Sequence, residues 1–161
     1  MNACRHFSRR RFLGTAAVTT PLLASLSGKA AGVADAMQVS GYLPDYRLAG
    51  FRAERGRLLT DLVCFSIQLA ANGQLDAAAA AIKVSGFKKL AKTSSQPVHL
   101  CIGGWERSAG FLQASMTTAS RQRLGQQLAR FCRAHGFSGV DLDWEHPRGA
   151  GQLANYKLLL Q

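Results

Sequence analysis

Acidic residues are scarce in this sequence, where nine Asp and Glu stand against 20 Lys and Arg for a formal net charge of +11. A basic balance can suit nucleic acid or another anionic surface. The basic residues are dispersed, however, with one tight group at Lys88, Lys89 and Lys92 and neither a zinc-finger spacing nor a basic helix. Dispersed charge is typical of a solvated surface, so we expect no nucleic-acid partner.

Cysteine is also sparse, and no two of the four cysteines have C-x-x-C spacing, which argues against a zinc or redox motif. Cys64 and Cys101 lie in apolar runs, so we expect buried free thiols, with a disulfide between the two as the alternative. The sequence has no apolar run of the roughly 20 residues that a membrane span needs, so we expect no stable membrane anchor. With 47% hydrophobic and 18% charged residues, the chain is typical of a globular protein.

The first 36 residues have the order of features found in a removable export signal: charged, then moderately apolar, then small. The segment from Ser8 to Leu13 reads S-R-R-R-F-L and resembles the twin-arginine signal. Ala34-Asp35-Ala36 offers a cleavage site, which divides the chain into a signal (1–36) and a mature part (37–161). We therefore expect the twin-arginine export machinery as a partner and a periplasmic or secreted protein. A retained arginine-rich helix is the alternative.

The mature part alternates strand and helix patterns. Short β-rich runs bounded by turn residues predict strands at 39–43, 62–67, 98–102 and 140–144. Apolar residues at three- and four-residue steps predict a helix over 120–134, capped by Gly136. Weaker helical signals cover 86–92 and begin near 152, and the alanine run 77–81 is either a helix start or a loop. Strands separated by helices predict an α/β fold with a parallel sheet.

The fourth predicted strand carries an unusual run of acids. Alternate side chains of a strand share a face, so Asp141, Asp143 and Glu145 would lie on one side, with the apolar residues between them on the other. Closely spaced carboxylates raise one another's pKa, and one of them can then hold a proton near neutral pH. A protonated carboxylic acid beside an ionised one is what glycosidic bond cleavage needs. A magnesium or calcium site and a solvated edge strand are the alternatives.

This segment, Ser138 to Glu145, resembles the D-G-x-D-x-D-x-E motif of glycoside hydrolase family 18, the chitinase family, with Ser138 in place of the first Asp. Cys101-Ile102-Gly103-Gly104 is similar to the family's S-x-G-G motif, with Cys in place of Ser. Gly41-Tyr42 near the first strand also fits. The resemblance covers roughly residues 38–161.

The resemblance implies a (β/α)8 barrel, typically about 250 residues long. Only four strand–helix units are predicted here, so we expect the N-terminal half of a barrel, a partial family 18 catalytic domain over 37–161. A tyrosine and a tryptophan that the family places on later strands have no counterparts. The expectation is that the 161-residue chain alone gives no useful hydrolysis.

The resemblance also implies a function, the cleavage of β-1,4-linked N-acetylglucosamine polymers such as chitin. Glu145 would be the general acid, and the N-acetyl carbonyl of the substrate would be the nucleophile. Asp143 would orient the acetamido group, and Asp141 would share a proton with Asp143. No metal or organic cofactor is implied.

Four further residues are expected to bind the sugar by the same resemblance: Tyr42, Trp105, Gly103 and Gly104. Ordinary core packing is the alternative for the two aromatic residues, and it is the favoured one for Trp105. Three other functions stay open: a chitinase-like lectin without hydrolysis, an endo-β-N-acetylglucosaminidase, and a metal-dependent phosphoryl-transfer protein.

Overall fold

The computed structural model describes residues 37–161, and the predicted export signal lies outside these residues. Four strands form one parallel sheet in the order β1-β2-β3-β4, so the predicted α/β alternation is confirmed. Their bounds are β1 Ser40–Pro44, β2 Asp61–Ile67, β3 Val98–Gly103 and β4 Gly139–Asp143.

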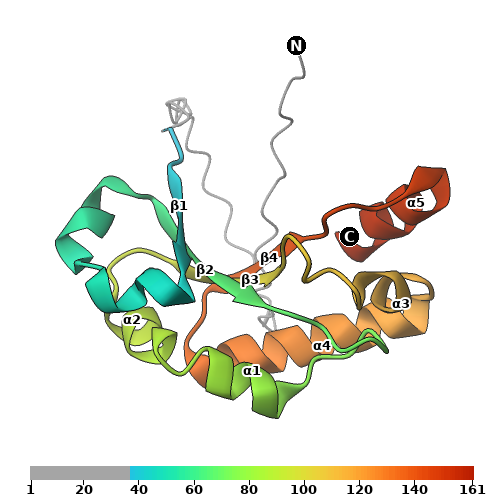
Figure 1. Cartoon of the computed structure of the whole chain (residues 1–161), viewed down its shortest axis with the longest axis horizontal. Coiled ribbons are helices and arrows are strands. Elements are labelled where there is room, and N and C mark those ends of the chain that lie inside the picture. Colours follow the sequence, from blue (N-terminus) through green and yellow to red (C-terminus); the bar gives the residue numbers. More distant parts are fainter. Residues whose placement is uncertain (1–36) are drawn as a thin grey trace, which may run out of the picture. The chain divides into compact units, whose positions relative to one another are not determined.

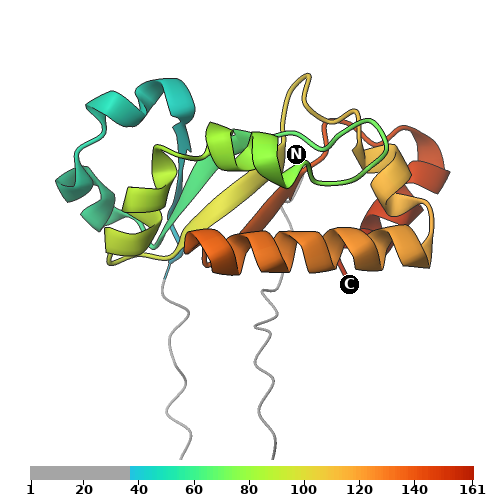
Figure 2. The ribbon, with the colours of Figure 1, turned by 90° about the horizontal axis from the view of Figure 1, so that it is seen from below.

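The helices that connect the strands lie together on one face of the sheet. Figure 1 shows α1, α2 and α4 on the same side of the strands, and Figure 2, seen from that side, shows α4 in front of them. The helical bounds are α1 Ala77–Lys83, α2 Phe87–Thr93, α3 Phe111–Ser115, α4 Thr118–His135 and α5 Gly149–Leu159, with 3-10 turns η1 Asp45–Gly50 and η2 Ala53–Leu58.

Helix α4 forms as its sequence pattern predicts. Thr117 and Ser120 make a reciprocal capping box at its start, and Gly136 ends it at a φ of +82°. Its buried face consists of Leu124, Leu128, Phe131 and Cys132. The alanine run is a helix of its own, α1, because the Asp76 carboxylate accepts hydrogen bonds from the first-turn amides of Ala78 and Ala79.

Three short elements were not expected from the sequence: η1, η2 and α3. Each has only five or six residues, so none is long enough to repeat an apolar pattern at helical spacing. The first strand, predicted over 39–43, extends to Pro44, which is the last residue of β1. A proline is tolerated there because β1 is an edge strand.

The core lies between the sheet and the helices. Cys64, Leu100 and Ile102 from the central strands are fully buried there, together with Phe111 of α3 and Leu124 of α4. Cys64 and Cys101 are buried free thiols, as predicted, and Cys132 is a third buried free thiol. Among residues 37–161, none of the helices combines the length and the hydrophobicity that a membrane span requires.

Candidate active site

Strand β4 presents its acids on the face of the sheet that the helices leave uncovered. Its register places Asp141 beside Cys101 and Asp143 beside Gly103 of β3. Leu142, between the two acids of the strand, packs against the core, and so does Trp144, the first residue after β4, whose ring stacks on Phe111 at a centroid distance of 5.5 Å. The alternation therefore separates the carboxylates from the apolar side chains between and after them.

Asp141 is held from two other strands. The Tyr42 hydroxyl of β1 donates a hydrogen bond of 2.8 Å to its Oδ2, which joins the two edge strands across the uncovered face. The Cys101 thiol of β3 is hydrogen-bonded to the same carboxylate. Burial, followed by the charges of Asp141 and Asp143, raises the pKa of Cys101 well above its usual range. The thiol therefore stays protonated and serves as a hydrogen-bond donor.

The surroundings of Asp143 favour the protonated form of its carboxyl group. Burial is the main cause of its raised pKa, followed by the charges of Glu145 and Asp141 and by a hydrogen bond with Glu145. Such an environment makes it easier for Asp143 to take up a proton next to a second carboxyl group. Asp143 thus lies within electrostatic reach of both Asp141 and Glu145.

Gly103 and Gly104 let the end of β3 approach its neighbours closely. Both are buried and have a φ near +100°. A Cβ at Gly103 would lie 2.3 Å from the Asp143 carbonyl oxygen, and one at Gly104 would lie 2.5 Å from the Phe65 ring. Any side chain here would push the sheet apart at the acids. Contact of these glycines with sugar stays a prediction.

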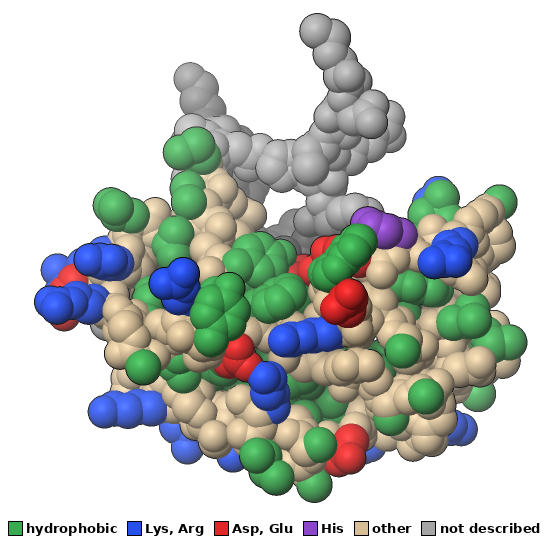
Figure 3. All heavy atoms as spheres, viewed as in Figure 1, with side chains coloured by type: hydrophobic (Ala, Val, Ile, Leu, Met, Phe, Trp, Pro, Cys, Tyr) green, Lys and Arg blue, Asp and Glu red, His purple; other side chains and the backbone are tan. Residues whose placement is uncertain are grey.

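The two predicted aromatic contacts are exposed: Tyr42 by 55% and Trp105 by 67%. Core packing, the interpretation favoured for Trp105, is therefore wrong. Its ring meets the His146 ring edge to face at 6.0 Å, directly after Glu145 in the chain. In the upper part of Figure 3, hydrophobic and acidic side chains lie next to one another, with a histidine beside them. Such a surface offers aromatic faces and hydrogen-bonding groups together, which suits a sugar.

Two residues of the loop between β3 and α3 were missed by sequence reasoning. Arg107 places its guanidinium over Phe65, 5.6 Å from the ring centroid, and donates to the Ser66 hydroxyl at 3.0 Å. Ser108 accepts a hydrogen bond from the Glu145 backbone N–H at 2.9 Å. No sequence signal pointed to either residue, because loop contacts depend on how β2, β3 and β4 come together.

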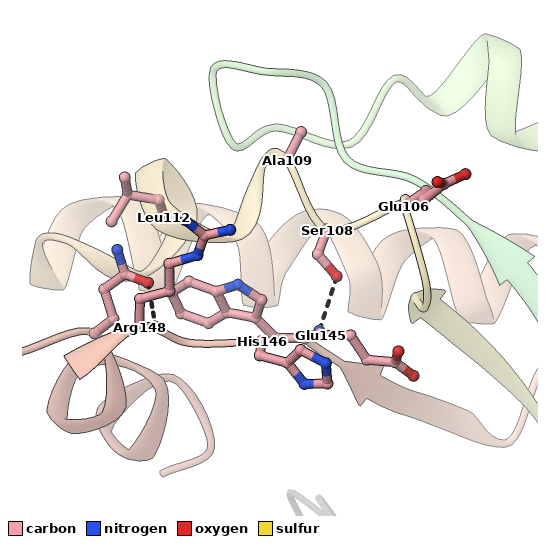
Figure 4. A pocket seen from close by; sticks show the side chains of 9 residues that line it. Glu106, Ser108, Ala109, Leu112, Glu145, His146 and Arg148 are labelled. Atoms are coloured by element: carbon pink, nitrogen blue, oxygen red, sulfur yellow. Dashed lines mark hydrogen bonds between the residues drawn. The ribbon is translucent and has the colours of Figure 1, made fainter. Parts of the chain in front are cut away.

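An open pocket of about 340 Å³ lies next to Glu145, between the β3–α3 loop and the start of α5. The Glu145 side chain extends away from the Arg148 end of the pocket (Figure 4). The lining residues are Glu106, Ser108, Ala109, Leu112, Trp144, Glu145, His146, Arg148 and Gln152.

The arrangement of the acids bears on the metal-site alternative. Within residues 37–161, no group of three or more His, Cys, Asp or Glu side chains is placed so that it could hold a metal ion. The acids instead interact with other groups of the chain: Asp141 accepts a hydrogen bond from Tyr42, and Asp143 is hydrogen-bonded to Glu145.

Known chitinases are similar to this chain in sequence. Chitinase 1 of Aphanocladium album is 44% identical over 64 residues, which is 40% of this chain and 15% of that protein. Endochitinase 1 of Metarhizium robertsii is 42% identical over 62 residues, or 38% of this chain and 15% of that protein.

Solved structures share the fold. The second catalytic domain of the Group II chitinase of Ostrinia furnacalis matches with a TM-score of 0.63 at 19% identity, covering 76% of this chain and 38% of that one. A family 18 chitinase of Cycas revoluta, solved with (GlcNAc)4, matches at 0.57 and 24% identity, with the same coverage. The chain thus spans about two fifths of the length of these solved chains and has part of their α/β barrel.

The model of the glycosyl hydrolases family 18 matches residues 38–161. This range contains the whole described sheet and all the acids of β4. The chain therefore belongs to glycosyl hydrolase family 18.

Proposed function

We propose that residues 37–161 carry the acid–base part of a chitinase site, which cleaves β-1,4-linked N-acetylglucosamine polymers. The observation that supports this most is the cluster of acids at the end of β4, where burial and the charges of Glu145 and Asp141 raise the pKa of Asp143 and where Tyr42 donates a hydrogen bond to Asp141. The relatives named chitinases and the solved relative with (GlcNAc)4 support the substrate class.

Glu145 is the general acid in the proposed mechanism. As the substrate enters, its acetamido N–H donates to Asp143, and the proton on Asp143 passes along the hydrogen bond to Glu145. Glu145 then protonates the leaving glycosidic oxygen, while the N-acetyl carbonyl oxygen attacks the anomeric carbon. The C–O bond breaks, and a cyclic oxazolinium ion forms on the remaining sugar.

The second step returns the site to its starting state. The Glu145 carboxylate takes a proton from water, the water oxygen adds to the anomeric carbon, and the ring opens to restore the acetamido group. Configuration is retained because the anomeric centre is inverted twice. Substrate-assisted hydrolysis of this kind needs no enzyme nucleophile. The Cys101 thiol does not act as one, because its raised pKa keeps it protonated.

The described residues contact only one side of a bound sugar. Tyr42 and Trp105 are both exposed, Tyr42 bonded to Asp141 and Trp105 against the His146 ring. Four strands form the sheet, whereas a complete barrel has eight. We therefore expect the chain alone to bind oligosaccharide weakly and to turn it over far more slowly than a full-length chitinase, because the sugar is neither enclosed nor distorted.

The test combines binding with turnover. Chemical shifts of the ¹⁵N-labelled chain should move at Tyr42, Trp105 and Asp143 on addition of chitotetraose, and should stay unchanged with cellotetraose, which lacks the acetamido groups. Release of dye from a chitobiose conjugate should be very slow. Any turnover should fall a further ~100-fold or more in Glu145→Gln, because general acids contribute about that much.

The outcomes separate the candidate functions. Equal shifts with both sugars, or none with either, would refute the proposed substrate. Turnover equal to that of a full-length relative would show that the described residues are sufficient. A longer polypeptide that completes the barrel and binds chitotetraose tightly without cutting it would identify a lectin, and Glu145 would then have no catalytic part.

A further inference from the structure

The hydroxyl of Ser108 lies where the β3–α3 loop crosses the end of β4. Its Oγ accepts the Glu145 backbone N–H at 2.9 Å, and it lies 3.2 Å from the Gly104 carbonyl oxygen and 3.3 Å from that of Asp143. A hydroxyl has one hydrogen, so it donates to one of these carbonyls at a time while it accepts from Glu145. The Ser108 side chain thus links three backbone positions, two of which belong to the acidic residues Asp143 and Glu145.

Glu145 needs such a contact because it lies beyond the sheet. Strand β4 ends at Asp143, and its pairing with β3 ends at Gly103. After Asp143, the backbone position is no longer determined by strand pairing with β3. Trp144 is fixed by its stacked ring in the core, and the next residue is fixed by Ser108 (Figure 4).

The loop that carries Ser108 is itself anchored on both sides. The neighbouring Arg107 donates to the Ser66 hydroxyl of β2 at 3.0 Å, and its own N–H donates to the Gly104 carbonyl at 3.0 Å. On the other side, the Phe111 N–H donates to the Ser108 carbonyl at 3.2 Å as α3 begins. The hydroxyl therefore has a defined position from which to hold another segment.

We propose that Ser108 is a positioning residue for Glu145, whose backbone it fixes at the end of β4 so that the carboxyl group stays in contact with Asp143. The inference rests on the proposed function for its catalytic meaning and on geometry for the contact itself. Displacement of a catalytic group by about 1 Å can cost roughly 100-fold in rate, so one hydrogen bond here has consequences for the reaction.

The test measures the hydrogen bond between Ser108 and the Glu145 backbone in the absence of any sugar. In the full chain, Ser108→Ala should speed hydrogen exchange of the Glu145 amide by about tenfold, since a lost hydrogen bond corresponds to a factor of that order. The ¹³C titration of the Asp143 side chain should move toward the ordinary value for aspartate, because contact with Glu145 contributes to its raised pKa. Exchange at Leu100 in the core should not change.

Two variants complete the test. Ser108→Thr keeps the hydroxyl and should keep the slow exchange, and it also serves if the alanine variant does not fold. Ser95→Ala removes an exposed hydroxyl bonded to the adjacent Gln96 and should leave Glu145 unaffected. The proposal is overturned if Ser108→Ala leaves both Glu145 exchange and the Asp143 titration unchanged, or if Leu100 loses protection as much as Glu145 does. It is also overturned if Ser108→Thr behaves like Ser108→Ala.

These readouts are independent of chitin. A chain that neither binds nor cuts chitin oligosaccharides would refute the proposed function, while the exchange result at Glu145 would still decide the positioning role. Where a longer, active polypeptide is available, Ser108→Ala should lower kcat and leave KM nearly unchanged.

Discussion

Asp143 ionises at a cost to the folded state, since its pKa in the fold lies above the ordinary value of 3.8. The folded state therefore loses stability as the pH rises through the pKa that Asp143 has in the fold. Asp143→Asn removes this cost and keeps an N–H donor toward Glu145. We expect the variant to be more stable than the wild type at pH 7, with an advantage that disappears as the pH falls toward 3.8. Urea unfolding midpoints at several pH values measure this.

Asp45 provides a control of opposite sign. Its hydrogen bond with Lys83 holds its pKa below the ordinary value, so ionised Asp45 stabilises the fold. Asp45→Asn should therefore lower stability at pH 7, and the difference should vanish as the pH falls through the lowered pKa. A loss of stability at pH 7 in both variants would contradict the environment described for Asp143.

The ends of α4 show how far one element is determined by its local sequence. Gly136 adopts a φ of +82°, which costs other L-residues roughly 1–2 kcal/mol. A Cβ there would also approach the flexible Lys92 side chain at 3.3 Å. Gly136→Ala should thus lower the free energy of unfolding by about 1–2 kcal/mol, measured by urea denaturation.

Gly125 is the matched control within the same helix. It lies in the interior of α4, and a Cβ there would meet nothing within 4 Å. Gly125→Ala should raise the free energy of unfolding by about 0.5–1 kcal/mol, because alanine loses less backbone entropy in a helix. If both alanines destabilised equally, the left-handed cap would not be the cause.

Elements with a long repeating pattern could be predicted from the sequence, and the short ones could not. The helix expected at 120–134 is α4, Thr118–His135, and each predicted strand is present within one or two residues. Helix α3 has five residues and is stabilised by the burial of Phe111 against Trp144, a contact between segments more than 30 positions apart. The residues near α3 in the sequence do not indicate that Trp144 packs against it.

At the scale of the whole molecule, export is the prediction that still needs a test, since the predicted signal lies outside the described residues. We propose that Arg9 and Arg10 direct the chain to the twin-arginine pathway. In a bacterium with that pathway, the full chain should appear in the periplasm or medium with Met37 as its first residue. Fractionation and N-terminal sequencing measure both.

The control for export is Arg11, because this residue occupies the variable position of the S-R-R-x-F-L pattern. Replacement of both Arg9 and Arg10 by lysine should leave an unprocessed precursor in the cytoplasm, and Arg11→Lys should be exported normally. Export of the double variant, or an uncleaved wild-type protein, would argue for a retained N-terminal helix.

The strand–helix alternation and the common face of Asp141 and Asp143 could be read from the amino-acid sequence alone, because they follow from periodicities of two and 3.6 residues within single segments. The groups that hold these acids became visible only in the folded chain. Tyr42 reaches Asp141 from a strand 99 positions away, and Ser108 reaches Glu145 from a loop 37 positions away. Such contacts depend on the curvature of the sheet and the packing of its loops, which no single segment encodes.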